Sequence, residues 1–200
     1  MAQIGTNIEF AVALLKQGKV IGMPTDTVYG IACNALNPDA IDAIYEIKNR
    51  DKSKALIAQT YSLKKASSFL EYVPTDGHKL AEKYWPGALT LVMKANNNIP
   101  KNMIAGGDTV GIRVPDHEMA LALLHSAEVP LAVTSANNSG EPSPTTAQEV
   151  NELLGDKIDY ILDGGKCSLG IESTIVGFNN EKPVVLRVGA ISEEEIFGSL

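Results

Sequence analysis

The stretch PLAVTSANNSGEPSPTT, residues 130–146, places a short apolar run directly before a long polar loop. The run PLAV is typical of a buried β-strand, and hydroxyl and amide side chains dominate from Thr134 onward. Two other apolar runs open into polar segments in the same way, VIGM before PTDT (20–27) and YIL before DGGKCSLGIES (160–173). Because such loops gather at one rim of a sheet, we expect a ligand crevice there.

Hydrophobic periodicity predicts interleaved helices and strands in the first half of the chain and mostly strands in the last third. Helices are expected over residues 118–127 and at the start signals Thr6 with Glu9, Asn37-Pro38, Ser62, Thr75, Thr146 with Glu149, and Ser192 with Glu195. Strands are expected at VIGMP (20–24), ALIAQ (55–59), ALTLVMKA (88–95), TVGIRVP (109–115), PLAV (130–133), YILD (160–163), STIVGF (173–178) and VVLRV (184–188). We therefore predict a single α/β domain over residues 1–200, with a twisted mixed β-sheet flanked by helices and a concave basic ligand crevice.

Composition excludes several classes of protein. A net charge of −7 and an isoelectric point near 5.0 argue against a protein that coats nucleic acid, because that function needs a broad basic surface. Cys33 and Cys167 show no metal-binding or disulfide spacing, so we expect buried free thiols in a reducing compartment. The sequence has no signal-peptide pattern and no apolar stretch of about 18 residues, which favours a cytoplasmic protein with no membrane partner.

Positive charge is nevertheless concentrated in KNRDKSK, residues 48–54. Lys48 and Arg50 are expected to face solvent at the crevice, where they could hold an anion such as a phosphate. Such a run at the end of a helix can equally form a solvated face that complements the helix dipole. The polar segments also have simpler interpretations, since Asp26 could cap a turn and Arg113 could lie on an edge strand.

The absent motifs restrict the chemistry further. The sequence contains no GxxxxGK[ST], GxGxxG, GxSxG or HExxH pattern, and its three histidines have no nucleophile at a motif spacing. A site of fixed cations, hydroxyls and backbone amides remains. Such a site suits phosphoryl or nucleotidyl transfer, which proceeds by positioning and charge neutralisation.

KNR (48–50) with SAN (135–137) resembles the paired K-x-R and S-x-N signature of the YrdC-like family. Further segments resemble family segments in the same order: PTDTVYG (24–30), WPGALTLV (85–92), TVGIRVPDH (109–117), SANNSGEPSPT (135–145), GIESTIV (170–176) and LRVGAI (186–191). The resemblance covers nearly the whole chain and is to the single-domain, TsaC-type members of the family.

The resemblance implies a nucleotidyltransferase that makes threonylcarbamoyl-AMP from L-threonine, bicarbonate or CO₂, and ATP for the threonylcarbamoyladenosine modification of tRNA. It implies no covalent nucleophile, and Lys48 and Arg50 would act electrostatically. Carried over by motif position, the ATP-binding residues are Lys48, Arg50, Lys54, Thr109, Ser135, Asn137, Ser143 and Arg187. The L-threonine-binding residues are Thr27, Gln59, Arg113, Val133 and Ser173. Mg²⁺ is expected to accompany ATP, with no metal ligand assigned to the protein.

Two alternatives stay open at this point. A YciO-type relative would keep the fold but have weak or different ATP-dependent activity. A non-catalytic RNA-binding module would grip RNA in the crevice, although few aromatic residues are available for stacking on bases. In the synthase interpretation the product passes to the tRNA threonylcarbamoyl transferase machinery, and a weak contact with tRNA is compatible with it.

Overall fold

The computed structural model describes residues 1–138 and 140–200, so position 139 of the SANNSGEPSPT segment lies outside the described residues. The strands are β1 (Gln3–Gly5), β2 (Ile21–Met23), β3 (Gly30–Asn34), β4 (Ile57–Gln59), β5 (Leu89–Lys94), β6 (Thr109–Arg113), β7 (Leu131–Ser135), β8 (Tyr160–Leu162), β9 (Thr174–Asn179) and β10 (Lys182–Arg187). The helices are α1 (Ile8–Lys16), α2 (Pro38–Lys48), α3 (Leu63–Ser67), α4 (Thr75–Tyr84), α5 (Glu118–Ala127), α6 (Ala147–Leu154) and α7 (Glu193–Phe197).

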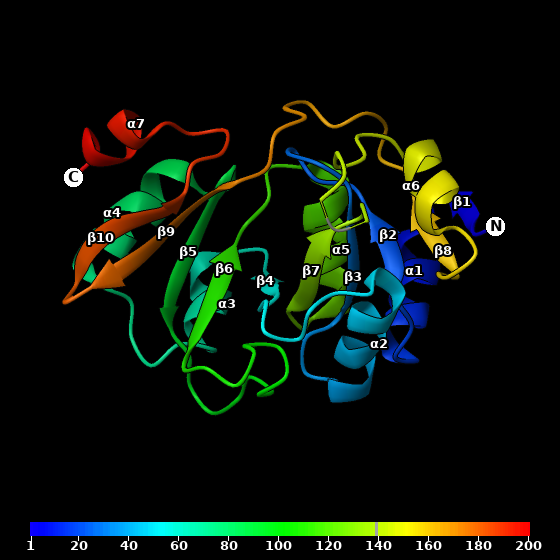
Figure 1. Cartoon of the computed structure of the whole chain (residues 1–200), viewed down its shortest axis with the longest axis horizontal. Helices are drawn as coiled ribbons and strands as arrows, with labels where there is room; N and C mark the ends of the chain where they lie inside the picture. The colour runs from blue at the N-terminus through cyan, green and yellow to red at the C-terminus, as the bar shows by residue number, and fades with distance from the viewer. Residues whose placement is uncertain (139) are drawn as a thin grey trace.

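All the strands join one ten-stranded sheet in the order β1-β8-β2-β3-β7-β4-β6-β5-β9-β10 (Figure 1). The sheet is mixed, with parallel pairs such as β4 with β6 and antiparallel pairs such as β3 with β7. The two chain ends lie at opposite ends of this sheet. The prediction of an α/β fold with a mixed sheet is confirmed.

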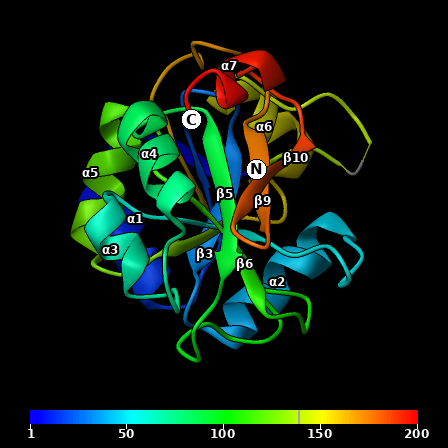
Figure 2. The ribbon, with the colours of Figure 1, turned by 90° about the vertical axis from the view of Figure 1, so that its left-hand side faces the viewer.

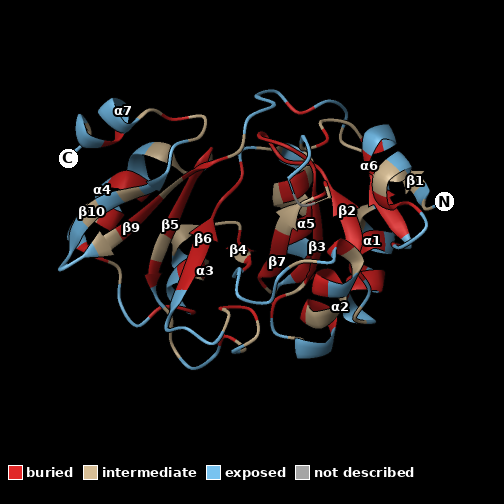
Figure 3. Ribbon diagram, viewed as in Figure 1, coloured by how far each residue is buried: buried red, intermediate tan, exposed pale blue. Residues whose placement is uncertain are grey.

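Helices cover the sheet unevenly. Figure 2 shows α1, α3, α4 and α5 on one side of the sheet and α2 and α6 on the other. Within the described part of the chain, no helix lies in front of β4, β6, β5 and β9 in the view of Figure 1. Figure 3 shows that the central strands are largely buried, whereas residues on the outer strand β10 are exposed. The face of β4, β6, β5 and β9 beside α2 is therefore not covered by a described helix.

Most helix starts are set by the predicted capping residues. Asn37 caps α2 by accepting from the backbone N–H of Asp39 and Ala40, and Thr146 with Glu149 forms a complete capping box on α6. Two predicted starts are wrong by one residue. Asn7, and not Thr6, caps α1, because its side chain accepts from the Phe10 N–H. Thr75 is the first helical residue of α4 and the preceding Pro74 is the cap residue.

Two strands, β1 and β3, were not predicted from the sequence. β3 is buried at nearly every position, with Ile31, Ala32 and Cys33 all fully buried. A strand covered on both faces has no alternation of polar and apolar residues, so the pattern that reveals half-exposed strands is missing. β1 has only three residues and pairs in parallel with the distant β8.

The interpretation of Arg113 as an edge-strand residue is wrong, because β6 lies between β4 and β5 inside the sheet.

Cys33 and Cys167 are free and buried, as predicted. Among the described helices, none has the length and apolar character needed to cross a bilayer.

Candidate active site

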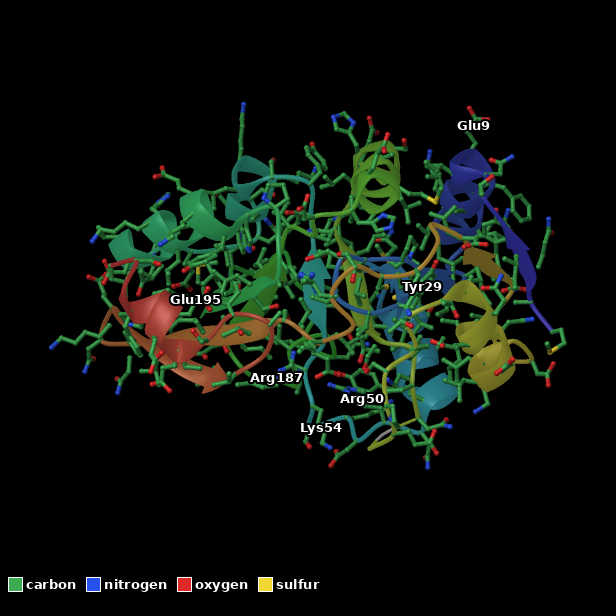
Figure 4. The ribbon with its side chains drawn as sticks, turned by 90° about the horizontal axis from the view of Figure 1, so that it is seen from above. Glu9, Tyr29, Arg50, Lys54, Arg187 and Glu195 are labelled. Atoms are coloured by element: carbon green, nitrogen blue, oxygen red, sulfur yellow. The ribbon has the colours of Figure 1, made fainter. Side chains whose placement is uncertain are left out.

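A cavity of about 300 Å³ lies beside the end of α2 and against β4, β6, β7 and β9. The described residues that line it are far apart in sequence: Thr25, residues 27–30, Lys48, Arg50, Ala55, Ile57, Gln59, Arg113, residues 133–135, Asn137, Gly140, Glu172, Ser173, Ile175 and Arg187. Figure 4 shows Arg50, after α2, and Arg187, at the end of β10, on the same side of the sheet. Side chains from both halves of the chain therefore meet at one site.

The K-N-R signature follows the shape of the helix end. Lys48 is the last residue of α2, and Asn49 adopts a left-handed conformation with φ of 46°, which ends the helix. The backbone N–H of Arg50 then donates to the Tyr45 carbonyl at 2.9 Å. This turn directs the chain from the helix into the cavity wall, so Lys48 and Arg50 both line the cavity.

Lys48 is buried, with 5% of its surface exposed, and the prediction that it faces solvent is wrong. Its ammonium donates to the carbonyl of Ser135 and, at 3.2 Å, to Asn137 Oδ1. Ser135 Oγ donates to the same Asn137 oxygen at 2.6 Å. The K-x-R and S-x-N segments are therefore joined by direct hydrogen bonds.

Burial changes the electrostatics of Lys48. Desolvation, assisted by repulsion from Arg50 and opposed by attraction from Glu172, lowers the pKa of Lys48 to about 8. Desolvation also lowers the pKa of Arg50. Burial thus disfavours the charged forms of both side chains, and an anionic ligand would offset the cost of burying these cations.

The basic cluster does not act as one unit. Arg50 donates to the carbonyls of Lys54 at 3.1 Å and Ala55 at 3.0 Å. Lys52 pairs with Asp42 on the protein surface at 3.2 Å, and the Lys54 side chain is exposed outside the cavity lining. Only the first two cations of the cluster reach the cavity.

Arg113 is held rigidly by three partners. Its Nη2 pairs with Asp26 Oδ1 at 2.5 Å, its Nη1 donates to Thr27 Oγ1 at 2.7 Å, and its Nε donates to the Gly87 carbonyl at 3.0 Å. The Arg113 and Asp26 side chains are each 5% exposed. A guanidinium has five N–H donors, so two have no acceptor among the described residues, and Arg113 lines the cavity. This geometry suits a carboxylate ligand.

Gln59 lies beside Arg113, because the two residues are register partners on β4 and β6. The Gln59 side chain is 3% exposed, and its Oε1 accepts no hydrogen bond from any described residue. A buried acceptor without a partner is costly, so this oxygen is suited to a hydrogen-bond donor on a ligand. Buried Ser173 contributes a hydroxyl that shares a 2.9 Å hydrogen bond with Thr90 Oγ1.

Glu172 also lines the cavity and was not predicted. Its Oε1 accepts from Ser143 Oγ at 3.0 Å, and its Oε2 pairs with Arg187 Nη1 at 2.9 Å. Arg187 Nη2 donates further to the Ser173 carbonyl at 2.8 Å. The signal that could have found Glu172 was its place in the segment GIESTIV, directly before the predicted Ser173.

Comparison with known proteins decides the family. Residues 13–189 match the Sua5/YciO/YrdC family, which carries the description "Telomere recombination". The chain belongs to this family. It is 40% identical to the threonylcarbamoyl-AMP synthases of Pyrococcus abyssi, over 94% of this chain and 56% of that protein, and of Bacillus subtilis, over 97% and 57%. The chain thus spans little more than half the length of these curated relatives.

Solved structures of the family agree with the fold. The crystal structure of P. abyssi Sua5 complexed with L-threonine has a TM-score of 0.93 at 36% identity and covers 100% of this chain and 62% of that one. E. coli YciO has a TM-score of 0.87 at 26% identity and covers 98% of this chain and 100% of that one.

Most of the site residues carried over from the family lie together in the cavity lining: Thr27, Lys48, Arg50, Gln59, Arg113, Val133, Ser135, Asn137, Ser173 and Arg187. Ser143 reaches the cavity through its hydrogen bond to Glu172. Lys54 and Thr109 have exposed side chains and do not line it. Residues missed by the sequence analysis include Tyr29 and Asp26, which had been interpreted only as a cap.

Proposed function

We propose that the chain is a threonylcarbamoyl-AMP synthase that converts L-threonine, bicarbonate and ATP into L-threonylcarbamoyladenylate, diphosphate and water. The observation that carries this proposal is that one cavity contains both buried Arg113, with two of its five N–H donors unpaired among the described residues, and a second group of cations. The 40% identity to two curated synthases supports it.

L-Threonine binds around Arg113 in this proposal. Its α-carboxylate takes the two free N–H groups of Arg113, and its amino or hydroxyl group donates to the unsatisfied Oε1 of Gln59. Thr27, Val133 and Ser173 complete the pocket for the amino acid. The relative from P. abyssi was solved as a complex with L-threonine, which supports L-threonine as the ligand.

ATP binds along the other part of the cavity. Lys48, Arg50 and Arg187 neutralise the phosphates, and the hydroxyl and amide groups of Ser135 and Asn137 position them. Ser143 contributes through its hydroxyl next to Arg187. The side chains of Lys54 and Thr109 are exposed outside the cavity lining, so any contact that they make with ATP is peripheral in this proposal.

The reaction has two steps. Bicarbonate takes up a proton and loses water to give CO₂. The neutral amine of threonine attacks the carbon of CO₂ and gives N-carboxythreonine with release of a proton, so the two proton steps balance. A carboxylate oxygen of this carbamate then attacks the α-phosphorus of ATP, and the bond from that phosphorus to the bridging oxygen breaks to release diphosphate. Lys48 and Arg50 lower the repulsion between the two anions, which is the main obstacle to the second step. No residue forms a covalent bond to the substrate.

Mg²⁺ enters as part of the ATP substrate, held mainly by phosphate oxygens and water. The product passes to the machinery that transfers the threonylcarbamoyl group to tRNA. We further propose a cytoplasmic location, which is consistent with the free buried thiols of Cys33 and Cys167.

The test is diphosphate release from MgATP and bicarbonate, with and without L-threonine, combined with mass detection of the adenylate. We expect release that depends on threonine and exceeds the release with L-serine. The Arg113→Ala variant should need at least about tenfold more threonine, since it loses a charge-assisted hydrogen-bond pair. Binding of ATP without any threonine-dependent release would instead favour a YciO-type relative with a different activity. Binding of RNA alone would favour the non-catalytic module.

A further inference from the structure

Glu172 is a negative charge placed where anions are expected to bind. It is the one carboxylate residue among the described residues that line the cavity, and its neighbours include Lys48, Arg50 and Arg187. Its side chain is 40% exposed, so water can reach it from the cavity side. A site that only had to attract phosphates would be stronger without this charge.

The two oxygens of Glu172 occupy two of the groups proposed to bind ATP. Oε1 accepts from the Ser143 hydroxyl and Oε2 pairs with Arg187 Nη1. A phosphate that approaches Ser143 and Arg187 therefore also approaches the carboxylate. A phosphate that shares Ser143 and Arg187 with the Glu172 carboxylate repels this carboxylate unless a cation lies between the two anions.

We propose that Glu172 is a ligand of the Mg²⁺ ion that accompanies ATP, and that it makes nucleotide binding selective for MgATP over free ATP. This inference rests on the proposed function for the identity of the nucleotide. Glu172 would contact the ion through a carboxylate oxygen, while Arg187 and Ser143 contact phosphate oxygens.

The residues present suit this ion. Mg²⁺ prefers oxygen ligands, keeps several waters, and is commonly held by one or two carboxylates together with substrate phosphates. A single partly exposed carboxylate beside phosphate-binding cations meets that description. The described residues contain no group of three His, Cys, Asp or Glu side chains that could hold a metal. The ion is therefore expected to bind together with the nucleotide and not before it.

A simpler role for Glu172 would be to brace Arg187 in position. The two roles predict different effects of removing its charge. If Glu172 only braces Arg187, removing its charge should change the affinity for ATP and for MgATP by the same factor. If Glu172 is a metal ligand, removing its charge should weaken the binding of MgATP and strengthen the binding of free ATP. Glu172→Gln is the informative variant, because glutamine keeps the size and an acceptor oxygen for Ser143 but carries no charge.

The experiment is calorimetric titration of ATP into the protein, once with excess Mg²⁺ and once with EDTA, without threonine. We expect Glu172→Gln to reduce the ratio of Kd in EDTA to Kd in Mg²⁺ by at least about fivefold, the size of one partly screened charge interaction. Glu172→Asp, which keeps the charge, should retain more of the wild-type ratio. Glu152→Gln is the matched control, because it removes an exposed carboxylate outside the cavity and should leave the ratio unchanged.

An unchanged or larger ratio in a folded Glu172→Gln protein would overturn the inference and leave only the brace. A reduced ratio in a protein that makes no adenylate would support the inference while the proposed function fails. A wild-type protein that makes the adenylate but shows equal affinity for ATP in Mg²⁺ and EDTA would overturn the inference alone. A protein that binds no ATP would overturn both.

Discussion

Binding of ATP should cause Lys48 to take up a proton near pH 8. In the ligand-free protein, burial lowers the pKa of this lysine from its ordinary value of 10.5 to about 8, with a further contribution from Arg50. A bound triphosphate adds several negative charges beside the ammonium. Negative charge stabilises the protonated form, so the pKa of Lys48 must rise when ATP binds.

The size of the uptake follows from the fraction of Lys48 that is neutral before binding. With a pKa of about 8, that fraction is about one half at pH 8, about one tenth at pH 7 and about nine tenths at pH 9. We therefore expect about 0.5 proton taken up per ATP at pH 8, with less at pH 7 and more at pH 9. Above pH 8 the affinity for ATP should fall as pH rises, because the uptake becomes part of binding.

Calorimetry in two buffers with different ionisation enthalpies measures this uptake directly. Lys48→Arg should bind ATP with no uptake at pH 8, since a guanidinium stays protonated. Lys52→Met, which changes an exposed lysine paired with Asp42, should show the wild-type value. Uptake near zero at pH 8 in the wild-type protein, or an unchanged value in Lys48→Arg, would refute the reasoning.

The same pKa has the opposite effect on stability. Between pH 8 and 10.5 the unfolded chain binds more protons at Lys48 than the folded chain does. The free energy of unfolding contributed by this group therefore increases as pH rises through that range. ATP affinity and intrinsic stability should consequently respond to alkaline pH in opposite directions.

Three further changes test the site. Asp26→Asn leaves the buried Arg113 charge uncompensated and should lower the free energy of unfolding by about 3 kcal/mol in urea titrations. The exposed control Asp156→Asn should change the free energy of unfolding little, and equal effects of the two substitutions would contradict the buried-pair argument. Gln59→Leu removes a buried oxygen that has no partner among the described residues, so the unfolding midpoint of this variant should not fall. The half-saturating threonine concentration in the diphosphate assay should rise about tenfold. An unchanged threonine dependence would remove Gln59 from the site. Thr109→Ala should leave the Kd for ATP within about twofold of wild type, because the side chain is exposed outside the cavity; a larger loss would restore it to the nucleotide site.

Local signals in the sequence were sufficient for elements whose ends carry their own caps. The α6 capping box at Thr146 and Glu149 and the Asn37-Pro38 start of α2 depend on hydrogen bonds within a few residues, so the sequence contains the whole cause. β3 depends on partners from β2 and β7 and is covered on both faces. Neither fact leaves a periodic pattern in Gly30–Asn34, which explains why that strand was missed.

Residue types and motifs indicated most of the site, but the partners of each residue could not be read from them. The burial of Lys48 results from its contact with Ser135 and Asn137, which lie more than eighty residues away. Likewise, Asp26, which follows β2, pairs with Arg113 on β6, although β3, β7 and β4 separate these two strands in the sheet. Charge runs alone predict exposure, and a distant pairing reversed that expectation for Lys48.

The order of strands in the sheet also bears on how the protein acquires its activity. Leu89 on β5 pairs in parallel with Thr174 on β9, so a long loop must close before Ser173 reaches the cavity. Closing long loops costs chain entropy early in folding, and topologies rich in such pairs fold slowly. The groups of the site extend from Thr27 to Arg187, so no short fragment of the chain contains the whole site. During synthesis on the ribosome, ligand binding would therefore appear only after β9 and β10 have emerged and paired, as one of the last events of folding.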